Sequence, residues 1–310
     1  MKFMVTGAAG FVGYRLVSEL AASGAEVVAL DRLYLPALYS MGKAVMPVQM
    51  DLVDEHCLPS SAEGCAAIFH LAATRSIPLS LRSPEAVLRN NLLSTLSVLE
   101  AARVARVPRV VFASSSSVYG DADQLPTPES APLKPYSPYS ASKAACESMV
   151  LSYARSFRLH CTILRLFNVV GARRDADKEF TEAVPRFINV VLSGGSPVIH
   201  GDGSQSRDFV HVSDVVRAFT LASTAEPPSG AIYNIGSGAA HSLLEVVGMI
   251  AQAVGRPSEP SFESARPGDI RTTCADIAAA SRDLGYQPRV SLREAIKLAV
   301  MEYRMRGIAE

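Results

Sequence analysis

The chain has 310 residues, 48% of them hydrophobic, and its 30 basic residues balance its 30 acidic residues. This length and apolar fraction predict a large packed core, and the even charge argues against a partner that is a nucleic acid or an anionic membrane. The five cysteines show no C-x-x-C pair and no metal-ligand spacing, which predicts a reducing compartment and no metal site. A strand pattern begins at once and no apolar run reaches membrane-spanning length, so we expect a cytoplasmic protein.

The first predicted elements are a short strand, a glycine turn and a helix, all within residues 1–22. The turn reads T-G-A-A-G-F-V-G at residues 6–13, one residue longer in its first gap than the usual dinucleotide-binding turn. In such turns the first glycine allows the tight bend, the second lets the backbone approach a pyrophosphate, and the third lets the helix pack closely on the strand. The residues expected to bind the cofactor here are Gly7, Gly10, Phe11, Val12 and Gly13.

The second predicted strand, residues 26–30, ends in an acidic and then a basic residue, Asp31 and Arg32. A carboxylate at this distance from a glycine turn is suited to bind the adenosine ribose hydroxyls, and it would repel a 2′-phosphate. Asp31 therefore favours NAD. Arg32 could stack on adenine or accept a phosphate, which leaves NADP as the less favoured cofactor.

Apolar runs and helical segments continue to alternate along the first half of the chain. Strands are predicted at 68–71, 110–112 and 162–166, and the longest helices at 84–106 and 139–157. This alternation is typical of parallel strands joined by crossover helices. The predicted fold class is therefore α/β, a Rossmann-type doubly wound parallel sheet.

From about residue 171 the pattern breaks. The later predicted elements are helices at 179–192, 214–223, 243–254, 277–284 and 292–304, and strands at 208–211 and 232–235. We predict an NAD-binding domain of residues 1–167, to which the chain returns at about 208–236. A smaller interleaved C-terminal lobe, residues 168–207 and 237–310, would bind the substrate in the cleft between the two parts.

The run P-Y-S-A-S-K at residues 138–143 places Tyr139 and Lys143 four residues apart on a predicted helix, where they share one face. A phenol with a pKa near ~10 is a poor base at neutral pH, and a fixed positive charge beside it would lower that pKa. The hydroxyl of Ser115 follows an apolar strand, at the sheet edge where open α/β sheets bind ligands. Ser115, Tyr139 and Lys143 are the predicted catalytic residues.

With these motifs in register, the chain resembles the extended short-chain dehydrogenase/reductase superfamily, and within it the nucleotide-sugar 4-epimerases of the UDP-galactose/UDP-N-acetylglucosamine type. Further similar segments are H-L-A-A at 70–73, R-L-F-N-V-V-G at 165–171, G-D-G-S-Q-S-R-D-F at 201–209 and R-P-G-D at 266–269. The resemblance covers essentially the whole chain. It implies a homodimer and, through relatives that act on N-acetylated sugars, a place in surface polysaccharide biosynthesis.

The resemblance also implies a mechanism. Tyr139, with Ser115, would remove the proton of the sugar 4-hydroxyl while hydride passes from C4 to tightly bound NAD, and hydride would then return to the other face of the 4-keto sugar. Lys143 would hold the nicotinamide ribose and lower the Tyr139 pKa. The other residues that the resemblance places at the cofactor are Asp51, Leu52, Leu71, Ala72, Ala73 and Asn91. Those that it places at the substrate phosphates are Asn168, Arg207 and Arg266.

Related dehydratases carry an Asp-Glu pair, and related decarboxylases a glutamate, where this chain has Ser116 and Ser117. The resemblance therefore favours an epimerase, and these hydroxyls would contact the hexose or simply bond the strand end. The small Thr273, where relatives limited to plain hexoses carry a tyrosine, leaves room for an acetamido group. The segment beginning at Ser76 resembles N-acetylated-sugar epimerases, and Arg75 could meet a C6 carboxylate or stay solvated.

The prediction is thus a UDP-hexose 4-epimerase that accepts N-acetylhexosamine or uronic acid forms. Two other enzymes stay open, a nucleotide-sugar 4-ketoreductase that exchanges its cofactor and a specific UDP-glucuronate 4-epimerase. A catalytically idle sensor of NAD(H) is a further alternative, against which the intact Ser115, Tyr139 and Lys143 argue.

Overall fold

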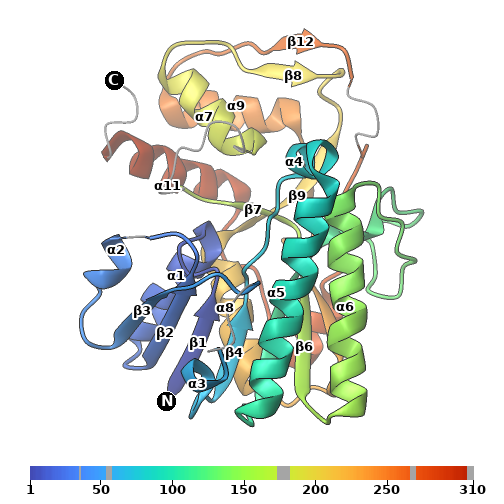
Figure 1. Cartoon of the computed structure of the whole chain (residues 1–310). Coiled ribbons are helices and arrows are strands. Elements are labelled where there is room, and N and C mark those ends of the chain that lie inside the picture. Colours follow the sequence, from blue (N-terminus) through green and yellow to red (C-terminus); the bar gives the residue numbers. More distant parts are fainter. Residues whose placement is uncertain (35, 54–57, 173–181, 266–269, 306–310) are drawn as a thin grey trace.

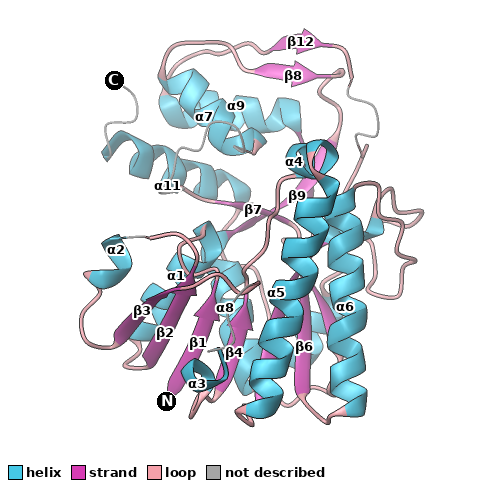
Figure 2. Ribbon diagram, in the orientation of Figure 1, coloured by secondary structure: helices cyan, strands magenta, loops and turns pink. Residues whose placement is uncertain are grey.

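The computed structural model describes residues 1–34, 36–53, 58–172, 182–265 and 270–305. Its centre is a seven-stranded parallel sheet in the order β10-β6-β5-β4-β1-β2-β3 (Figures 1 and 2). These strands are β1 Lys2–Thr6, β2 Glu26–Asp31, β3 Val45–Gln49, β4 Ala67–His70, β5 Arg109–Ser115, β6 His160–Leu166 and β10 Ala231–Ile235. The predicted doubly wound fold class is confirmed, because the strand order runs outward in both directions from β1.

Helices cover both faces of the sheet. Alternate residues of β1 point to opposite faces, so that Phe3 and Val5 join one apolar core and Met4 joins the other. The first core is closed by α1 Phe11–Ala22, α8 Val212–Thr224 and α10 Ala278–Leu284, and the second by α3 Leu58–Ala62, α5 Pro84–Val104 and α6 Pro138–Ser156. Two short helices, α2 Pro36–Tyr39 and α4 Ile77–Arg82, and the 3-10 turn η1 Ser116–Tyr119 lie in the connections.

A smaller layer lies beyond the carboxyl ends of the strands (Figure 1). It has its own apolar core, formed by α7 Ala183–Leu192, α9 Leu243–Val254 and α11 Leu292–Met305. Two small sheets complete it: β7 Asn168–Val170, β9 Ser206–His211 and β11 Ala240–Ser242 in one, and β8 Val198–His200 with β12 Ser261–Glu263 in the other. The division of the chain into two domains stays a prediction.

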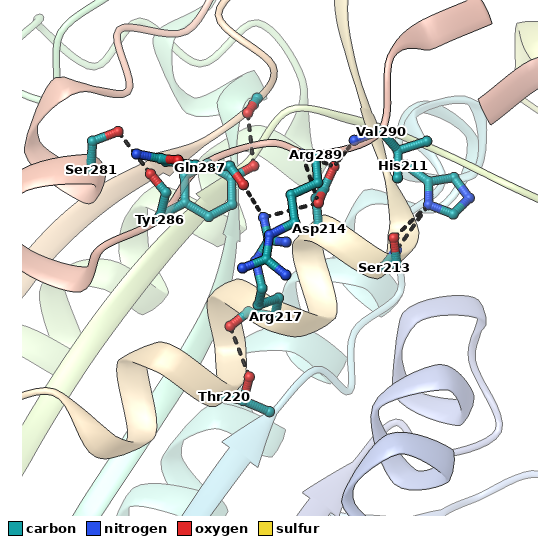
Figure 3. A network of polar contacts seen from close by, with 11 residues as sticks. His211, Ser213, Asp214, Arg217, Thr220, Ser281, Tyr286, Gln287, Arg289 and Val290 are labelled. Atoms are coloured by element: carbon teal, nitrogen blue, oxygen red, sulfur yellow. Dashed lines mark hydrogen bonds and ion pairs between the residues drawn. The ribbon is translucent and has the colours of Figure 1, made fainter. Parts of the chain in front are cut away.

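The segment between α10 and α11 is tied to the Rossmann layer by a polar network on α8 (Figure 3). Asp214, which is 1% exposed, accepts hydrogen bonds from the backbone N–H groups of Arg289 and Val290. It also forms an ion pair with Arg217 at 3.0 Å. Tyr286 donates its hydroxyl to the carbonyl of Gly236 at 2.8 Å. These bonds hold the segment between α10 and α11 beside α8 and the end of β10.

Several mostly short elements differ from the sequence-based expectation, including α2, α3, η1, β7, β11 and β12, which were not predicted. Strand β3 and helix α4 were not predicted, because β3 is short and contains Pro47 and α4 follows the long loop after β4. Helix α7 begins at Ala183, whereas the prediction began it at 179; residues 173–181 lie outside the described part of the chain.

Candidate active site

The glycine turn lies at the carboxyl end of β1 and leads into α1. Gly7 has φ +72°, and a Cβ on it would lie 2.7 Å from the backbone N of Ala72, so the turn and the loop after β4 are in close contact. A Cβ on Gly13 would lie 2.1 Å from the carbonyl oxygen of Gly7. The N-cap residue of α1 is Gly10, which has no side chain to cap the helix, so the start of α1 has the form of an anion-binding helix N-terminus.

The end of β2 is fastened to this turn through Asp31. Its carboxylate accepts hydrogen bonds from the backbone N–H of Ala9 and of Leu33, both at 2.9 Å. Burial raises the pKa of Asp31, and these two bonds act against that shift. The neighbouring Arg32 is exposed, whereas Leu52, predicted to border the adenine, is 5% exposed within the core. Asp51 accepts the backbone N–H of Val53 at 3.0 Å.

Helix α6 begins with Pro138 directly after Ser137, whose side chain accepts the backbone N–H of Ser140. This start places Tyr139 and Lys143 on the buried face of the helix, at 8% and 4% exposure. The Lys143 ammonium donates to the carbonyl of Ala113 at 2.8 Å. Burial lowers the pKa of Lys143 to about 8.

Burial raises the pKa of Tyr139, while a hydrogen bond with Ser115 and the nearby Arg75 charge lower it. The influence of Lys143 on Tyr139, expected from their spacing, stays a prediction, since the ammonium is bound to the strand end here. The Ser115 hydroxyl accepts bonds from the backbone N–H and hydroxyl of Ser117, at 3.2 and 2.9 Å. The structure therefore brings the predicted catalytic groups together, with Ser116 and Ser117 in the same turn.

The loop after β4, which contains Leu71, Ala72 and Ala73, is held by Asn91 of α5. The Asn91 side chain is 1% exposed, accepts the backbone N–H of Thr74 at 2.7 Å and donates to the Ser142 hydroxyl at 2.9 Å. Its amide is thus engaged with protein groups that fix this loop against α6.

His70, just before that loop, belongs to the segment 70–73 that the resemblance places along the cofactor, but its buried ring bonds Thr6 and Thr95 in the core. Its Nδ1 lies 2.8 Å from the Thr6 hydroxyl and its Nε2 3.1 Å from that of Thr95. Thr95 donates its proton to the Asn91 carbonyl at 2.7 Å, so Nε2 must be the donor and Nδ1 the acceptor of a neutral imidazole.

We expect His70 to make the protein sensitive to acid. Burial, reinforced by the Lys143 charge, lowers its pKa to about 3, below the ordinary 6.5. The stability that this neutral ring provides is fully present above pH 6.5 and is lost as the pH falls toward 3, at up to about 1.4 kcal/mol per pH unit. Urea unfolding at pH 6.5 and 5 should therefore differ by about 2 kcal/mol more in the wild type than in His70→Gln. Equal pH dependence in both, with His160→Gln as the control, would contradict this.

On the far side of the strand ends, Asn168 begins β7 shortly after β6. Its amide donates to the carbonyl of Asp208 at 3.2 Å and lies 3.5 Å from the Thr273 hydroxyl, so these two predicted substrate residues are neighbours. The Arg207 guanidinium donates to the carbonyl of Ser206 at 2.9 Å and to that of Arg271 at 3.3 Å. Arg266 lies outside the described residues.

Asp208 organises this second group, and the sequence analysis assigned it no role. The carboxylate is fully buried and accepts four hydrogen bonds: from the N–H and hydroxyl of Ser237, the N–H of Gly238 and the N–H of Ala275. Segments far apart in the chain meet on this one side chain.

Arg75 and Ser76 lie at the edge of the site. Arg75 is exposed and forms an ion pair of 2.8 Å with Glu182, the residue that precedes α7 in the smaller layer. Ser76 accepts the backbone N–H of Leu79 and so begins helix α4. Arg75 therefore spans from the Rossmann layer to the smaller layer beside Tyr139.

A family model described as "NAD dependent epimerase/dehydratase family" matches residues 3–236. The chain belongs to this family. It is 38% identical to UDP-glucose 4-epimerase of Mycolicibacterium smegmatis, over 98% of this chain and 99% of that protein. UDP-glucose 4-epimerase of Thermotoga maritima, solved with UDP-glucose, has a TM-score of 0.93 at 32% identity, covering 99% of both chains.

MoeE5, solved with NAD and either UDP-glucose or UDP-glucuronic acid, has a TM-score of 0.90 at 40% identity, covering 99% of this chain and all of that one. The relatives also include dTDP-glucose 4,6-dehydratases. The cofactor of the family is NAD. No helix among the described residues is long and apolar enough to cross a bilayer.

Proposed function

We propose that this family member is a UDP-hexose 4-epimerase that interconverts gluco and galacto configurations and keeps its NAD through the cycle. The observation that carries the proposal is the group formed by Ser115, Tyr139 and Lys143 at the strand ends, with hydroxyls at Ser116 and Ser117. A dehydratase or decarboxylase needs an acid or base next to the reacting carbon, and these two hydroxyls are poor candidates for that role.

The residues around the glycine turn fit NAD. The turn is too narrow for any side chain at Gly7 or Gly13, and the uncapped first turn of α1 can bind the pyrophosphate. Asp31 would bind the adenosine ribose, and Lys143 the nicotinamide ribose. The bound cofactor supplies hydride acceptance from the sugar C4 and hydride return.

The chain's own residues manage the proton. Tyr139, as phenolate, takes the proton of the sugar 4-hydroxyl. The hydroxyl of Ser115, which is hydrogen-bonded to Tyr139, lies between the tyrosine oxygen and the sugar 4-oxygen and passes the proton. Since burial raises the Tyr139 pKa, nearby positive charge must lower it in the active complex, and Arg75 and Lys143 are the groups placed to do so. Asn168 and Arg207 bind the phosphates of the nucleotide.

For the sugar, we propose that N-acetylhexosamine or uronic acid forms are accepted. Thr273 lies beside Asn168, and its small side chain would occupy less of the site than the tyrosine of relatives limited to plain hexoses, which favours an acetamido group. The Arg75 guanidinium lies near Tyr139 and is paired with Glu182. On substrate binding it can leave Glu182 and pair with the C6 carboxylate of a uronic acid instead.

The test is to incubate the purified protein, without added cofactor, with UDP-glucose, UDP-N-acetylglucosamine and UDP-glucuronate separately and to follow the sugar C4 and anomeric protons by NMR. Appearance of a galacto-epimer supports an NAD-retaining epimerase and identifies the sugar. Turnover that depends on added NAD(P)H and leaves a reduced 4-keto sugar would support the 4-ketoreductase instead.

We expect Arg75→Gln to separate acidic from neutral sugars. If the guanidinium binds a C6 carboxylate, its loss removes a charge-assisted hydrogen bond of about 1.5–3 kcal/mol, so KM for UDP-glucuronate should rise roughly 10- to 100-fold. KM for UDP-glucose should change less than about twofold. Arg82→Gln, in the last turn of α4, is the control. An equal rise of KM for both sugars would count against carboxylate recognition by Arg75, whereas an equal fall of kcat would reflect its charge beside Tyr139.

We also propose a homodimer that buries the outer faces of α5 and α6. These helices pack on each other, and Leu96 of α5 and Leu81 of the adjoining α4 are 39% and 64% exposed. Light scattering of the purified protein at several concentrations tests this.

A further inference from the structure

A buried ion pair lies one helical turn beyond Lys143 on α6. The side chains of Glu147 and Arg165 are each 3% exposed, and the guanidinium binds both carboxylate oxygens, at 2.7 Å through Nη2 and 3.0 Å through Nε. The desolvation cost of a buried pair is comparable to its Coulombic gain, so a contribution to net stability does not account for it.

The pair is joined to the catalytic residues through the end of β5. Tyr139, Lys143 and Glu147 follow at intervals of four and therefore share one side of α6. Ser114 donates its hydroxyl to Glu147 Oε1 at 2.5 Å. Lys143 is bonded to Ala113, and Tyr139 to Ser115. Each of the three residues 113–115 therefore makes a hydrogen bond to this one side of α6.

Arg165 extends the same connection to the far end of the serine turn. Its Nη1 donates to the Tyr119 hydroxyl at 2.8 Å and to the Glu129 carbonyl at 2.9 Å, and its guanidinium lies 4.8 Å above the Tyr119 ring. The Tyr119 hydroxyl donates in turn to Asn234 of β10 at 2.7 Å. Because Tyr119 ends η1 and Ser114 directly precedes its cap Ser115, the ion pair contacts the end of that turn and the residue before its start.

We propose that Glu147 and Arg165 are positioning residues for the reaction, which fix α6 against the end of β5 so that Tyr139 and Lys143 face Ser115. The inference rests on the proposed 4-epimerase function for its kinetic consequences. A misplacement of about 1 Å at reacting groups can cost about 10²-fold in rate, and a loss of this alignment should appear in kcat rather than in KM.

Glu147 also acts on the charge of Lys143. Burial lowers the Lys143 pKa to about 8, while Cys146 and Glu147 act to raise it. The other titratable groups near Lys143 are Tyr139, one turn earlier on α6, and His70 of β4, while Arg165 of β6 is bonded to Glu147 on its far side. Without the Glu147 charge the Lys143 pKa falls further, and a protonated lysine is lost at lower pH. A residue that served packing alone would not move this titration.

The experiment compares the NAD-bound wild type with Glu147→Gln, which keeps the size of the side chain and removes its charge. With UDP-glucose, kcat should fall about 10- to 100-fold, KM should stay within about twofold, and the alkaline limb of the kcat–pH profile should move to lower pH. Glu100→Gln, which breaks the Glu100–Arg103 ion pair on α5 where the carboxylate is 39% exposed, is the matched control and should leave all three unchanged.

A second readout does not depend on turnover. Titration of ¹³C-labelled lysine by NMR in the purified protein without substrate, with the Lys143 signal assigned through Lys143→Arg, should show a lower pKa in Glu147→Gln than in the wild type. If the wild type converts no UDP-sugar, the proposed function fails, and this titration still decides the role of Glu147. Unchanged kcat and an unchanged titration in a folded Glu147→Gln would overturn the inference.

Ser114→Ala covers the case in which Glu147→Gln does not fold, because it keeps both charges and removes one hydrogen bond to α6. We expect it to lower kcat about 3- to 10-fold, with KM and the alkaline limb unmoved. A wild-type kcat in Ser114→Ala would then reject the positioning role.

Discussion

Replacing Tyr139 with Phe is expected to lower kcat for epimerisation by about 10²- to 10⁴-fold, the range typical of a lost general base, without releasing NAD. Tyr139 is 8% exposed, and its hydroxyl is hydrogen-bonded to Ser115. The substitution therefore removes the group that carries the proton and leaves the ring in place. Single-turnover reduction of the bound NAD by UDP-glucose, followed at 340 nm, reports the hydride step directly.

Tyr153→Phe is the matched control for this substitution. Tyr153 lies on the same helix and donates its hydroxyl to Glu100 at 2.5 Å, far from the strand ends. Its loss should leave kcat within about twofold of the wild type. If Tyr139→Phe retained wild-type kcat, Tyr139 would not be the general base and the proposed mechanism would fall, whereas a wild type that converts no UDP-sugar would favour the NAD(H) sensor.

Gly13→Ala is expected to abolish NAD retention and to destabilise the protein by about 3 kcal/mol, although helix propensity alone favours alanine by about 1 kcal/mol. The added Cβ would lie 2.1 Å from the carbonyl oxygen and 2.8 Å from the carbonyl carbon of Gly7, and backbone atoms cannot move aside like a flexible side chain. The glycine turn or α1 must therefore shift away from the pyrophosphate position.

Gly248→Ala provides the contrast, because Gly248 is also inside a helix and has no atom within 4 Å of a built Cβ. It should keep NAD and raise stability by up to about 1 kcal/mol. Thermal unfolding and the ratio of absorbance at 260 and 280 nm after gel filtration measure both effects. A Gly13→Ala protein that kept bound NAD and the wild-type melting temperature would show that the turn is not the cofactor cradle.

Local patterns were sufficient to predict the first elements of the site. The glycine turn and Asp31 could be recognised because a tight turn, a helix start and the end of the next strand are all encoded within about 30 consecutive residues. Tyr139 and Lys143 were recognised from their spacing on one helix, which the structure reproduces in α6. Ser115 followed from the end of an apolar strand.

Other features depend on the tertiary structure, because their partners are distant in the chain. Nothing near Glu147 in the sequence indicates that it meets Arg165, 18 residues later, or Ser114, 33 residues earlier, since the sheet order alone places β6 next to β5. Asp208 likewise has no local partner in the sequence, and only the folded chain brings it four donors. His70 reads as part of a cofactor-lining motif, yet packing turns its ring into the core.

The residues alone were enough to predict the fold class, a cofactor site at the glycine turn and a catalytic role for Ser115, Tyr139 and Lys143, because glycine geometry, apolar periodicity and helix spacing act over short stretches of chain. How those side chains are held, and the contact of Asn168 with Thr273, depend on the folded chain. A buried carboxylate is stable only where several distant segments supply its donors, and that arrangement exists once the sheet has formed and its two layers have packed.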